Sequence, residues 1–408
     1  MLFSDATPGM GRGFNTVGLR NATLLLGSTL TVMAGAIIAP ALPEISREFA
    51  HLPRAELLSK LILTLPALFI ALMAPLAGAI VDYSGRRRVL LASFLLYALA
   101  GTTGVWLPGI YLILVGRALL GVAVGAMMTS IVTLIGDYYQ DKARSRLMGY
   151  QAAFASTGGL VFITTGGLLA DVHWRYPFWI YAVALIILIM AWFSVNEPGR
   201  ARVLPGHTLP GRLLFRQIPR QVWWVYAVAF FSFAVFYMIP VQMPFMLSAL
   251  GGVSNAEVGF AIAFMNVTAM ITAFNYARIK RRFDFPLLMA LVYLLVAAGY
   301  FVISQAVSYF MMIAGILVSG LGFGLQMANI NLWLVNLAPA NIRGTLVGYL
   351  NAFIFMGMFL SPVIFQPVIS LSSLYHAFGV VALLLLLLAW GLAVSYRRGY
   401  WTPAVDRG

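Results

Sequence analysis

Twelve long runs of mainly apolar residues follow one another along the chain, separated by short polar segments. A helix needs about 20 such residues to cross the hydrocarbon core of a bilayer, and each run is long enough. The runs are continuous rather than alternating, which excludes a transmembrane barrel. They predict twelve membrane-spanning helices, at approximately residues 20–43, 55–80, 89–108, 110–136, 145–169, 177–196, 222–248, 256–276, 285–306, 309–335, 344–370 and 376–396.

The longest polar stretch, residues 197–221, falls between the sixth and seventh runs. The two halves align with an offset of 199 residues, which places Gly121 and Gly125 on Gly320 and Gly324. Duplicated six-helix halves are typical of transporters, with the binding site where the halves meet. We therefore expect an all-α membrane protein of two pseudo-symmetric six-helix bundles, residues 1–196 and 222–408, joined by a cytoplasmic linker.

The composition supports a membrane protein and excludes a soluble enzyme or a disordered regulator. Of 408 residues, 62% are hydrophobic and 9% are charged, whereas a soluble domain carries about 25% charged residues. The net charge of +14 is explained by basic residues in cytoplasmic loops, which set the orientation of membrane proteins. With the N-terminus in the cytoplasm, 21 of the 26 lysines and arginines fall on the cytoplasmic side. The charge pattern predicts a multi-pass protein of the cell inner membrane with both termini cytoplasmic, and no nucleic-acid partner.

Residue types that carry enzyme chemistry are scarce. The chain has no cysteine, and its four histidines are scattered in or beside predicted loops. No zinc, nucleotide or serine-nucleophile signature occurs. We expect no metal, no cofactor and no catalytic residues, and therefore not an enzyme.

The sharpest motif joins the second and third runs: Gly78-Ala-Ile-Val-Asp82-Tyr-Ser-Gly85-Arg86-Arg87-Arg88. Gly78 permits close helix contact, and Gly85 permits a tight turn. Asp82 places a carboxylate at a helix end, where it needs a cationic partner or a helix N-terminus. The spacing resembles the loop signature of the major facilitator superfamily, and the resemblance covers essentially the whole chain.

Two further motifs extend this resemblance. Arg117-Ala-Leu-Leu-Gly121 is similar to the family's second signature. Gly166-Gly167-Leu-Leu-Ala-Asp171 resembles the end of the fifth span in the drug:proton antiporter-1 type of efflux protein, although Phe162-Ile163 stand where that type has Gly-Pro.

The resemblance implies a secondary active transporter that works by alternating access. It also implies a conformational switch made of Gly78, Asp82, Gly85, Arg86 and Arg87. In the family this loop contacts the opposite half, here around Arg343-Gly344.

Polar side chains at helix depth are the candidates for substrate binding. Arg117 lies inside a span, where a charge is costly and usually faces a cavity or a partner. Amides at this depth also need partners and should face the protein interior, where they either join helices or contact a ligand. The predicted substrate-binding residues are Arg117, Tyr237, Gln242, Asn266, Gln326 and Trp333.

No acidic residue lies near the middle of a span, so proton coupling has few candidates. We nominate Asp82 and Asp137, which lie at span ends. Glu56 and Glu257, which align in the two halves, are expected to cap helices, and Lys60 is expected to pair with Glu56.

The favoured function is proton-linked efflux of an amphipathic compound. The first alternative is uptake or facilitated movement of a polar metabolite, sugar or organic anion. The second is a transport-inactive membrane sensor or scaffold. The expected partners are a small-molecule substrate, the lipid bilayer and protons, and the expected state is a monomer.

Overall fold

The computed structural model describes residues 16–198, 218–339 and 342–401. Twelve helical segments in this part of the chain are long and apolar enough to cross a membrane, which confirms the predicted number of spans. Residues 199–217 of the predicted linker lie outside the described residues. The elements are α1 (Thr16–Ala36), η1 (Ala39–Ala41), α2 (Leu42–Glu48), α3 (Ala55–Ser84), α4 (Arg86–Gly101), α5 (Thr103–Trp106), α6 (Ile110–Tyr138), α7 (Asp141–Val172), η2 (Tyr176–Ala182), α8 (Val183–Ser194), α10 (Arg220–Ala249), α11 (Asn255–Phe274), α12 (Tyr276–Lys280), α13 (Phe285–Ser304), α14 (Tyr309–Leu337), α15 (Arg343–Leu371) and α16 (Leu374–Arg397).

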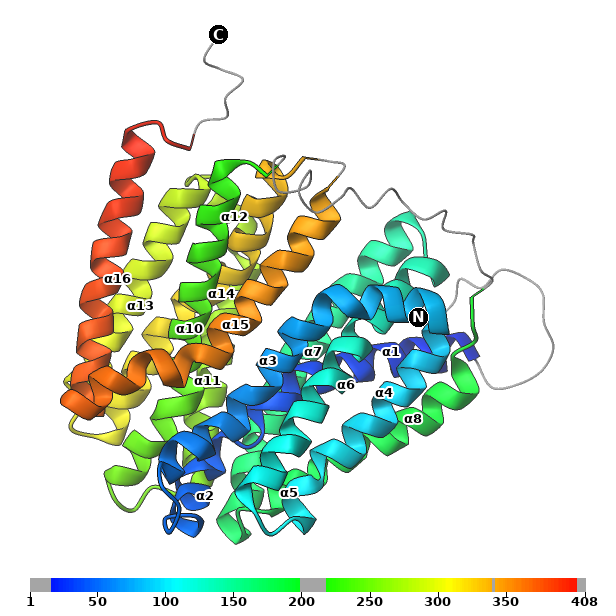
Figure 1. Ribbon diagram of the computed structural model, residues 1–408. Coiled ribbons are helices and arrows are strands. Elements are labelled where there is room, and N and C mark those ends of the chain that lie inside the picture. Colours follow the sequence, from blue (N-terminus) through cyan, green and yellow to red (C-terminus); the bar gives the residue numbers. More distant parts are fainter. Residues whose placement is uncertain (1–15, 199–217, 340–341, 402–408) are drawn as a thin grey trace.

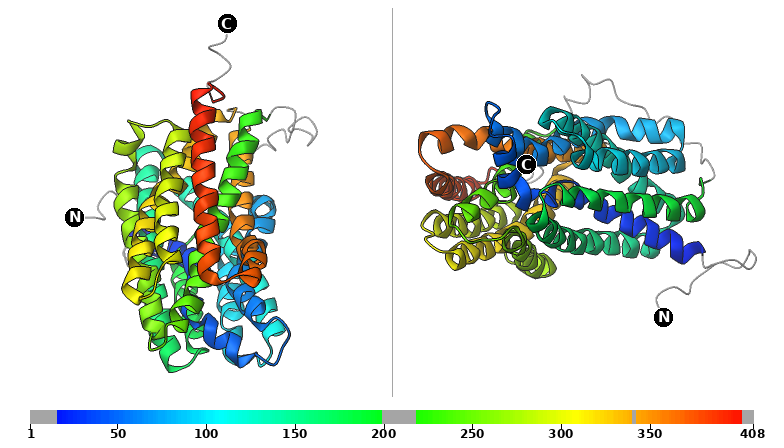
Figure 2. Two further views of the ribbon diagram at one scale, coloured as in Figure 1. Left: turned by 90° about the vertical axis from the view of Figure 1, so that its left-hand side faces the viewer. Right: turned by 90° about the horizontal axis from the view of Figure 1, so that it is seen from below.

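The helices form two bundles, α1–α8 and α10–α16, which lie beside each other (Figures 1 and 2). Equivalent helices pair within each bundle: α1 packs on α7 as α10 packs on α15, and α3 packs on α6 as α11 packs on α14. Two pairs of long helices make the main contacts between the bundles, α3 with α15 and α7 with α11, and η1 and α2 also contact α10. The expected pseudo-symmetric six-helix architecture is confirmed.

Each bundle is fastened internally by a buried tyrosine. Tyr97 of α4 donates a hydrogen bond to the carbonyl oxygen of Leu30 in α1, at 2.8 Å. In the second bundle, Tyr300 of α13 donates to the carbonyl oxygen of Val235 in α10, at 2.5 Å. A buried tyrosine needs a partner for its hydroxyl group, and here that partner is helix backbone. The same contact therefore joins the third and first spans of both halves.

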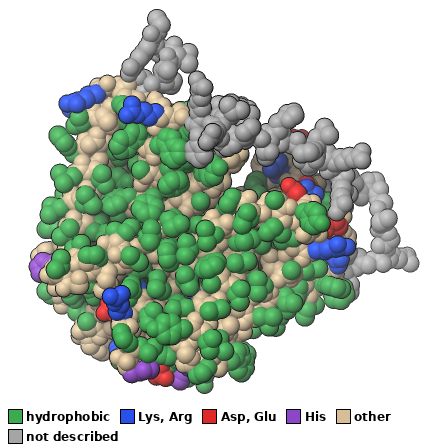
Figure 3. Space-filling model, viewed as in Figure 1, with side chains coloured by type: hydrophobic (Ala, Val, Ile, Leu, Met, Phe, Trp, Pro, Cys, Tyr) green, Lys and Arg blue, Asp and Glu red, His purple; other side chains and the backbone are tan. Residues whose placement is uncertain are grey.

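The outer surface matches a bilayer. Hydrophobic side chains cover most of the visible flank, and charged side chains gather mainly toward its two ends (Figure 3). We name these ends after the short helices that lie there, the α2 end and the α12 end.

The two bundles are in close contact at the α2 end (Figure 1). A methyl group on Gly167 would lie 2.5 Å from the carbonyl oxygen of Asn255, and one on Gly259 would lie 2.9 Å from that of Ile163. Only glycine allows the backbones of α7 and α11 to approach this closely.

A carboxylate from the first bundle binds the start of α11 in the second. Asp171 Oδ1 accepts a hydrogen bond from the backbone N–H of Asn255 at 2.6 Å, and Oδ2 accepts one from that of Ala256 at 3.2 Å. Glu44 of α2 accepts a third bond, from the Asn255 side chain at 2.6 Å. The first N–H groups of a helix have no partner within the helix and lie at its positive end, so they favour a carboxylate.

Asp171 and Arg175 are four residues apart, a spacing that would suit a pair in a solvated loop, but no ion pair between them is found in the described part of the chain. Arg175 instead donates to the carbonyl oxygens of Gly104 and Leu107 in its own bundle, and its guanidinium lies over Trp174. The carboxylate is free to cross to the other bundle because the arginine has neutral partners.

At the α12 end the ribbons of the two bundles lie apart (Figure 1). Gly78 of α3 and Gly344 and Gly348 of α15 have no atom within 4 Å of where a methyl group would sit. The hydrogen bonds that join described residues of the two bundles are those of Asp171 and Glu44, at the opposite end. The helix pair α3–α15 is therefore packed toward the α2 end and open toward the α12 end.

Replacing Asp171 with alanine should loosen the α2 end, because two charge-assisted hydrogen bonds between the bundles are lost. The chain has no cysteine, so spin labels at Val172→Cys and Ala249→Cys report the separation of the bundles by pulsed electron paramagnetic resonance. We expect a longer and broader distance distribution in Asp171→Ala.

Asp284→Ala is the matched control, because Asp284 also lies at a helix end but bonds Tyr396 of its own bundle. It should leave the label distance unchanged. An unchanged distribution in Asp171→Ala would show that the carboxylate does not hold the bundles together.

Candidate functional site

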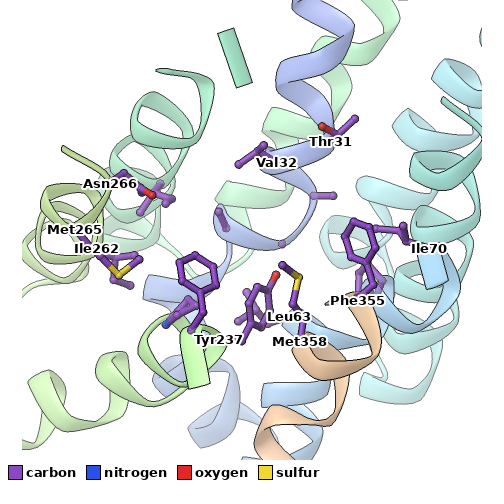
Figure 4. Close-up of a pocket in the computed structure, with 18 of the residues that line it drawn as sticks. Thr31, Val32, Leu63, Ile70, Tyr237, Ile262, Met265, Asn266, Phe355 and Met358 are labelled. Atoms are coloured by element: carbon purple, nitrogen blue, oxygen red, sulfur yellow. The ribbon is translucent and has the colours of Figure 1, made fainter. Parts of the chain in front are cut away.

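A cavity of about 250 Å³ lies between the two bundles (Figure 4). The first bundle lines it with α1, α3, α6 and α7, and the second with α10, α11 and α15. The lining residues are Thr31, Val32, Ala34, Gly35, Ala36, Leu63, Pro66, Ala67, Ile70, Met128, Ile163, Phe236, Tyr237, Pro240, Ile262, Met265, Asn266, Phe355 and Met358. The cavity is thus built where the bundles meet, as the duplication predicts.

The cavity wall is apolar and uncharged, with three polar side chains: Thr31, Tyr237 and Asn266. The Thr31 hydroxyl already donates to the carbonyl oxygen of Ser28 at 2.8 Å. The Tyr237 hydroxyl and the Asn266 amide form no hydrogen bond with any described residue, so both are free for a ligand. Apolar walls with a few placed polar groups are the usual chemistry of small-molecule sites.

Prolines interrupt the backbone hydrogen bonding of two helices that form this wall. Pro240 of α10 lines the cavity and has no N–H to donate to the carbonyl oxygen of Phe236, one turn earlier. Pro66 of α3 has the same effect on the carbonyl oxygen of Ile62. Such breaks are tolerated in a membrane-spanning helix where other groups or a cavity satisfy the freed backbone.

A close approach between α1 and α10 fixes the position of the tyrosine. A methyl group on Gly35 would lie 2.5 Å from the Tyr237 hydroxyl oxygen. The ring therefore crosses from the second bundle to the backbone of the first, and any larger side chain at position 35 would displace it.

Of the six predicted binding residues, Tyr237 and Asn266 line the cavity and the other four do not. Gln326 and Trp333 are buried in α14, where Trp333 stacks on Phe285 and packs edge-on against Trp401. Gln242 is buried just beyond Pro240, with its Oε1 atom unpaired. These three side chains are buried, as their polarity requires, but they do not line the cavity between the bundles.

Arg117 is a clear departure from expectation, since its side chain is fully buried within the first bundle. Nη2 donates to the carbonyl oxygens of Gly101 at 2.5 Å and Ala100 at 3.2 Å. The guanidinium also lies over the rings of Tyr181 and Phe178, at 4.7 and 5.1 Å. Because α4 ends at Gly101, its last carbonyls lie at the negative end of the helix dipole, which attracts the guanidinium.

The loop between α3 and α4 is held by its own bundle. Gly85 turns with φ of +93°, a conformation that favours glycine. The Glu197 carboxylate accepts from the backbone N–H groups of Arg86 and Arg87, at 2.8 and 2.9 Å. Arg86 also contacts Asp137, with Nε 2.7 Å from Oδ2. The resulting charge cluster ties together the ends of α3, α4, α6 and α8.

The contact of this loop with Arg343-Gly344, which the family resemblance implies, is absent from the described part of the chain. Gly78 and Gly344 both face open space, and Asp82 is mainly exposed, 4.0 Å from Arg86. The separation of the bundles at the α12 end accounts for the difference.

Several residues of the site escaped sequence reasoning. Glu197 stands in a Glu-Pro-Gly sequence typical of a linker, and its capping of α4 could not be foreseen from the spacing. The methionines at 128, 265 and 358 line the cavity, although such residues usually serve packing. Gly35 gave no signal beyond its small size.

Comparison with known proteins agrees with this architecture. The family model described as Major Facilitator Superfamily matches residues 24–362. Tetracycline resistance protein, class C, of Escherichia coli is 31% identical over 194 residues, which are 45% of this chain and 48% of that protein. Multidrug resistance protein 1 of Bacillus subtilis is 29% identical over 130 residues, 32% of this chain and 33% of that protein. These alignments span between a third and a half of the length of the relatives.

Solved structures show the same fold over nearly the whole chain. A bacterial homologue of the human lysosomal transporter Spinster, in an inward-facing and occupied conformation, has a TM-score of 0.77 at 16% identity, covering 95% of this chain and 98% of that one. A D-xylose–proton symporter has a TM-score of 0.73 at 17% identity, covering 92% and 98%. The chain belongs to the Major Facilitator Superfamily and is an integral multi-pass membrane protein.

Proposed function

We propose that the protein exports an amphipathic organic compound, uncharged or weakly polar, by proton-linked alternating access. The observation that carries this proposal is the cavity between the bundles, which is apolar, uncharged and supplied with two free hydrogen-bonding side chains. A charged group inside such a wall would lose its hydration without gaining a partner. The efflux direction is supported by the resistance proteins among the relatives.

We further propose that the α12 end faces the cytoplasm of a bacterial inner membrane, with both termini on that side. The basic clusters Arg86–Arg88, Lys142–Arg146 and Arg278–Arg282 lie at this end, as the positive-inside rule requires. In this orientation the cavity is closed toward the outside by Asp171 and Glu44. The conformation described here would then be the one that receives substrate from the cytoplasm, with the bundles 1–196 and 222–408 moving about the cavity as a monomer.

Asp82, Gly85, Arg86 and Arg87, together with Gly78, are proposed to act as the conformational switch. The exposed Asp82 and the empty space beside Gly78 and Gly344 support this role, because both would gain contacts if the bundles closed at the α12 end. Asp82 and Asp137 belong to this charge cluster, which lies at the far end of α3 and α6 from the cavity. A role in switching therefore suits them better than the proton coupling suggested by sequence.

The alternatives receive less support from the cavity. A sugar presents many hydroxyl groups, and the wall offers few partners for them. An organic anion needs a cation, and Arg117 is enclosed between α4 and η2. A transport-inactive sensor would not need a cavity that both bundles line.

Purified protein in liposomes tests the transport proposal. Vesicles loaded with unlabelled chloramphenicol, an uncharged aromatic compound, should take up labelled chloramphenicol by counterflow faster than protein-free vesicles. D-Xylose and the aromatic anion benzoate should show no protein-dependent flux, because the wall offers neither enough hydrogen-bonding groups nor a cation.

Flux of D-xylose or benzoate at a rate comparable to chloramphenicol would contradict the assignment from the cavity. Absence of protein-dependent flux for chloramphenicol, for the cation ethidium and for tetracycline would instead favour the sensor or scaffold.

Variants of the cavity locate the binding site. Asn266→Ala and Tyr237→Phe each remove one hydrogen-bonding group, worth about 1 kcal/mol or roughly a fivefold loss of affinity. Gly35→Ala should have a larger effect, because it displaces the whole ring. Affinity is measured by equilibrium dialysis of labelled chloramphenicol against detergent-solubilised protein.

The matched control is Gln326→Leu, which alters a buried amide outside the cavity. If Gln326→Leu weakens binding and Asn266→Ala and Tyr237→Phe do not, the ligand binds elsewhere.

A further inference from the structure

A buried lysine lies between the two bundles, close to the cavity. Lys60 of α3 has no exposed side-chain area, and its Nζ atom lies 2.5 Å from Glu56 Oε1, one turn earlier. The pairing itself agrees with the sequence. The sequence does not predict the second neighbour of the ammonium group: Nζ also lies 5.0 Å from the ring centroid of Phe245, in α10 of the other bundle.

Glu56 has access to solvent where Lys60 has none. Its side chain is 47% exposed and borders a second cavity of about 600 Å³ at the α2 end, between α3 and α15. This cleft is lined by Arg54, Glu56, Leu57, Val363, Gln366, Pro367 and Ser370.

Glu56 does not cap α3, contrary to the expectation from sequence, since Arg54 stands at the N-cap without a side-chain bond. The aligned Glu257 does form the expected capping box, with Ser254.

A row of side chains leads from this cleft toward the cavity. Glu56, Lys60 and Thr64 are spaced four residues apart and so share one face of α3. Thr64 is buried and its hydroxyl oxygen has no partner. Leu63, beside it in sequence, lines the cavity. The row therefore ends within one residue of the cavity wall.

Among the described residues, Lys60 and Arg117 are the fully buried charged side chains. They differ in chemistry, because an arginine keeps its proton in proteins whereas a buried lysine can release it. The Arg117 guanidinium also donates from Nη2 to two backbone carbonyls and lies over two aromatic rings. Lys60 depends on one carboxylate, so its charge depends on the state of Glu56.

We propose that Glu56 and Lys60 form the proton-binding site of the transporter, loaded through the cleft and emptied toward the cavity. A proton from the cleft binds the Glu56 carboxylate and leaves the buried ammonium group without a counter-charge. Lys60 then releases its proton to water on the Thr64 side and takes the proton held on Glu56 Oε1. One proton has moved from the cleft to the cavity, and both side chains have returned to their starting state.

The contact with Phe245 links this site to the conformational change. Separation of the bundles at the α2 end removes the ring from Nζ and admits water to the pair. The other charged groups nearby are Arg54 at the cleft, which is exposed, and three residues of α2. Of these three, Glu44 bonds Asn255, and Arg47 and Glu48 are exposed. Phe245, Gln366 and Ser370, which α10 and α15 contribute, do not titrate.

This inference rests on the proposed proton-linked transport, and liposomes can test the two separately. Accumulation of labelled chloramphenicol driven by an imposed pH gradient requires the proton site, whereas counterflow does not. Lys60→Arg keeps the charge without a releasable proton, and Glu56→Gln removes the entry group. Both should reduce gradient-driven accumulation to the level without a gradient and retain counterflow. Glu257→Gln, the matched change in the other half, should retain both activities.

Gradient-driven accumulation that persists in Glu56→Gln or Lys60→Arg would overturn the proposal. So would loss of counterflow together with gradient response in Glu56→Gln, which would show that the pair serves transport as such. Since Glu56 is half exposed, this variant should fold even if Lys60→Arg does not. A parent protein without counterflow would refute the proposed function itself, whereas counterflow without any gradient response would refute only the proton linkage.

Discussion

The bond between the Asp171 carboxylate and the first turn of α11 is the polar contact on which the arrangement of the two bundles depends. The N–H groups at the start of a helix have no partner within the helix, and the dipole makes that end positive. Asp171 satisfies two of them from the opposite bundle. Glycines at 167 and 259 allow the backbones to come close enough for this bond.

Closure at one end has a consequence at the other because each bundle is internally fastened. The bonds from Tyr97 to α1 and from Tyr300 to α10 join helices within a bundle. Two such units, in contact at the α2 end, leave the glycines at the α12 ends of α3 and α15 facing open space. The cavity lies between the α2 end, where the bundles touch, and the α12 end, where they are apart, and both bundles contribute its walls.

The sequence was sufficient for the spans and the duplication, because bilayer thickness imposes a length on every apolar run. The site was predicted only in part. Polarity at helix depth indicates that a side chain faces the interior, but not whether it faces a neighbour in its own bundle or the space between bundles. Asn266 and Tyr237 line the cavity between the bundles, whereas Gln326 is buried outside it.

Arg117 illustrates why the remaining assignments required the fold. Its guanidinium binds the carbonyl oxygens at the end of α4. The spacing of residues in the sequence does not reveal where the end of α4 lies relative to α6. The same holds for Glu197 at the start of α4 and for Asp171 at the start of α11. In each case a charged side chain binds backbone groups at a helix end. Every residue has such backbone groups, so the binding partner cannot be recognised from a sequence motif.

The separation between the uncharged cavity and the nearby charged pair has a functional consequence under our proposals. Substrate selection would rest on Tyr237, Asn266 and an apolar wall, and proton binding on Glu56 and Lys60, one turn away along α3. Because the two sites share a helix but no side chain, coupling between them would pass through the movement of the bundles. Substrates of varied shape could then use one proton site.

Access to the cavity from each side of the membrane tests the central claim most directly. A cysteine at Thr31, on the cavity wall, would be the only thiol in the chain, and a membrane-impermeant thiol reagent can be applied to either side of oriented vesicles. The account predicts that, without substrate or gradient, Thr31→Cys reacts from the side of the α12 end. Reaction from the side of the α2 end alone, or equally from both sides, would contradict it.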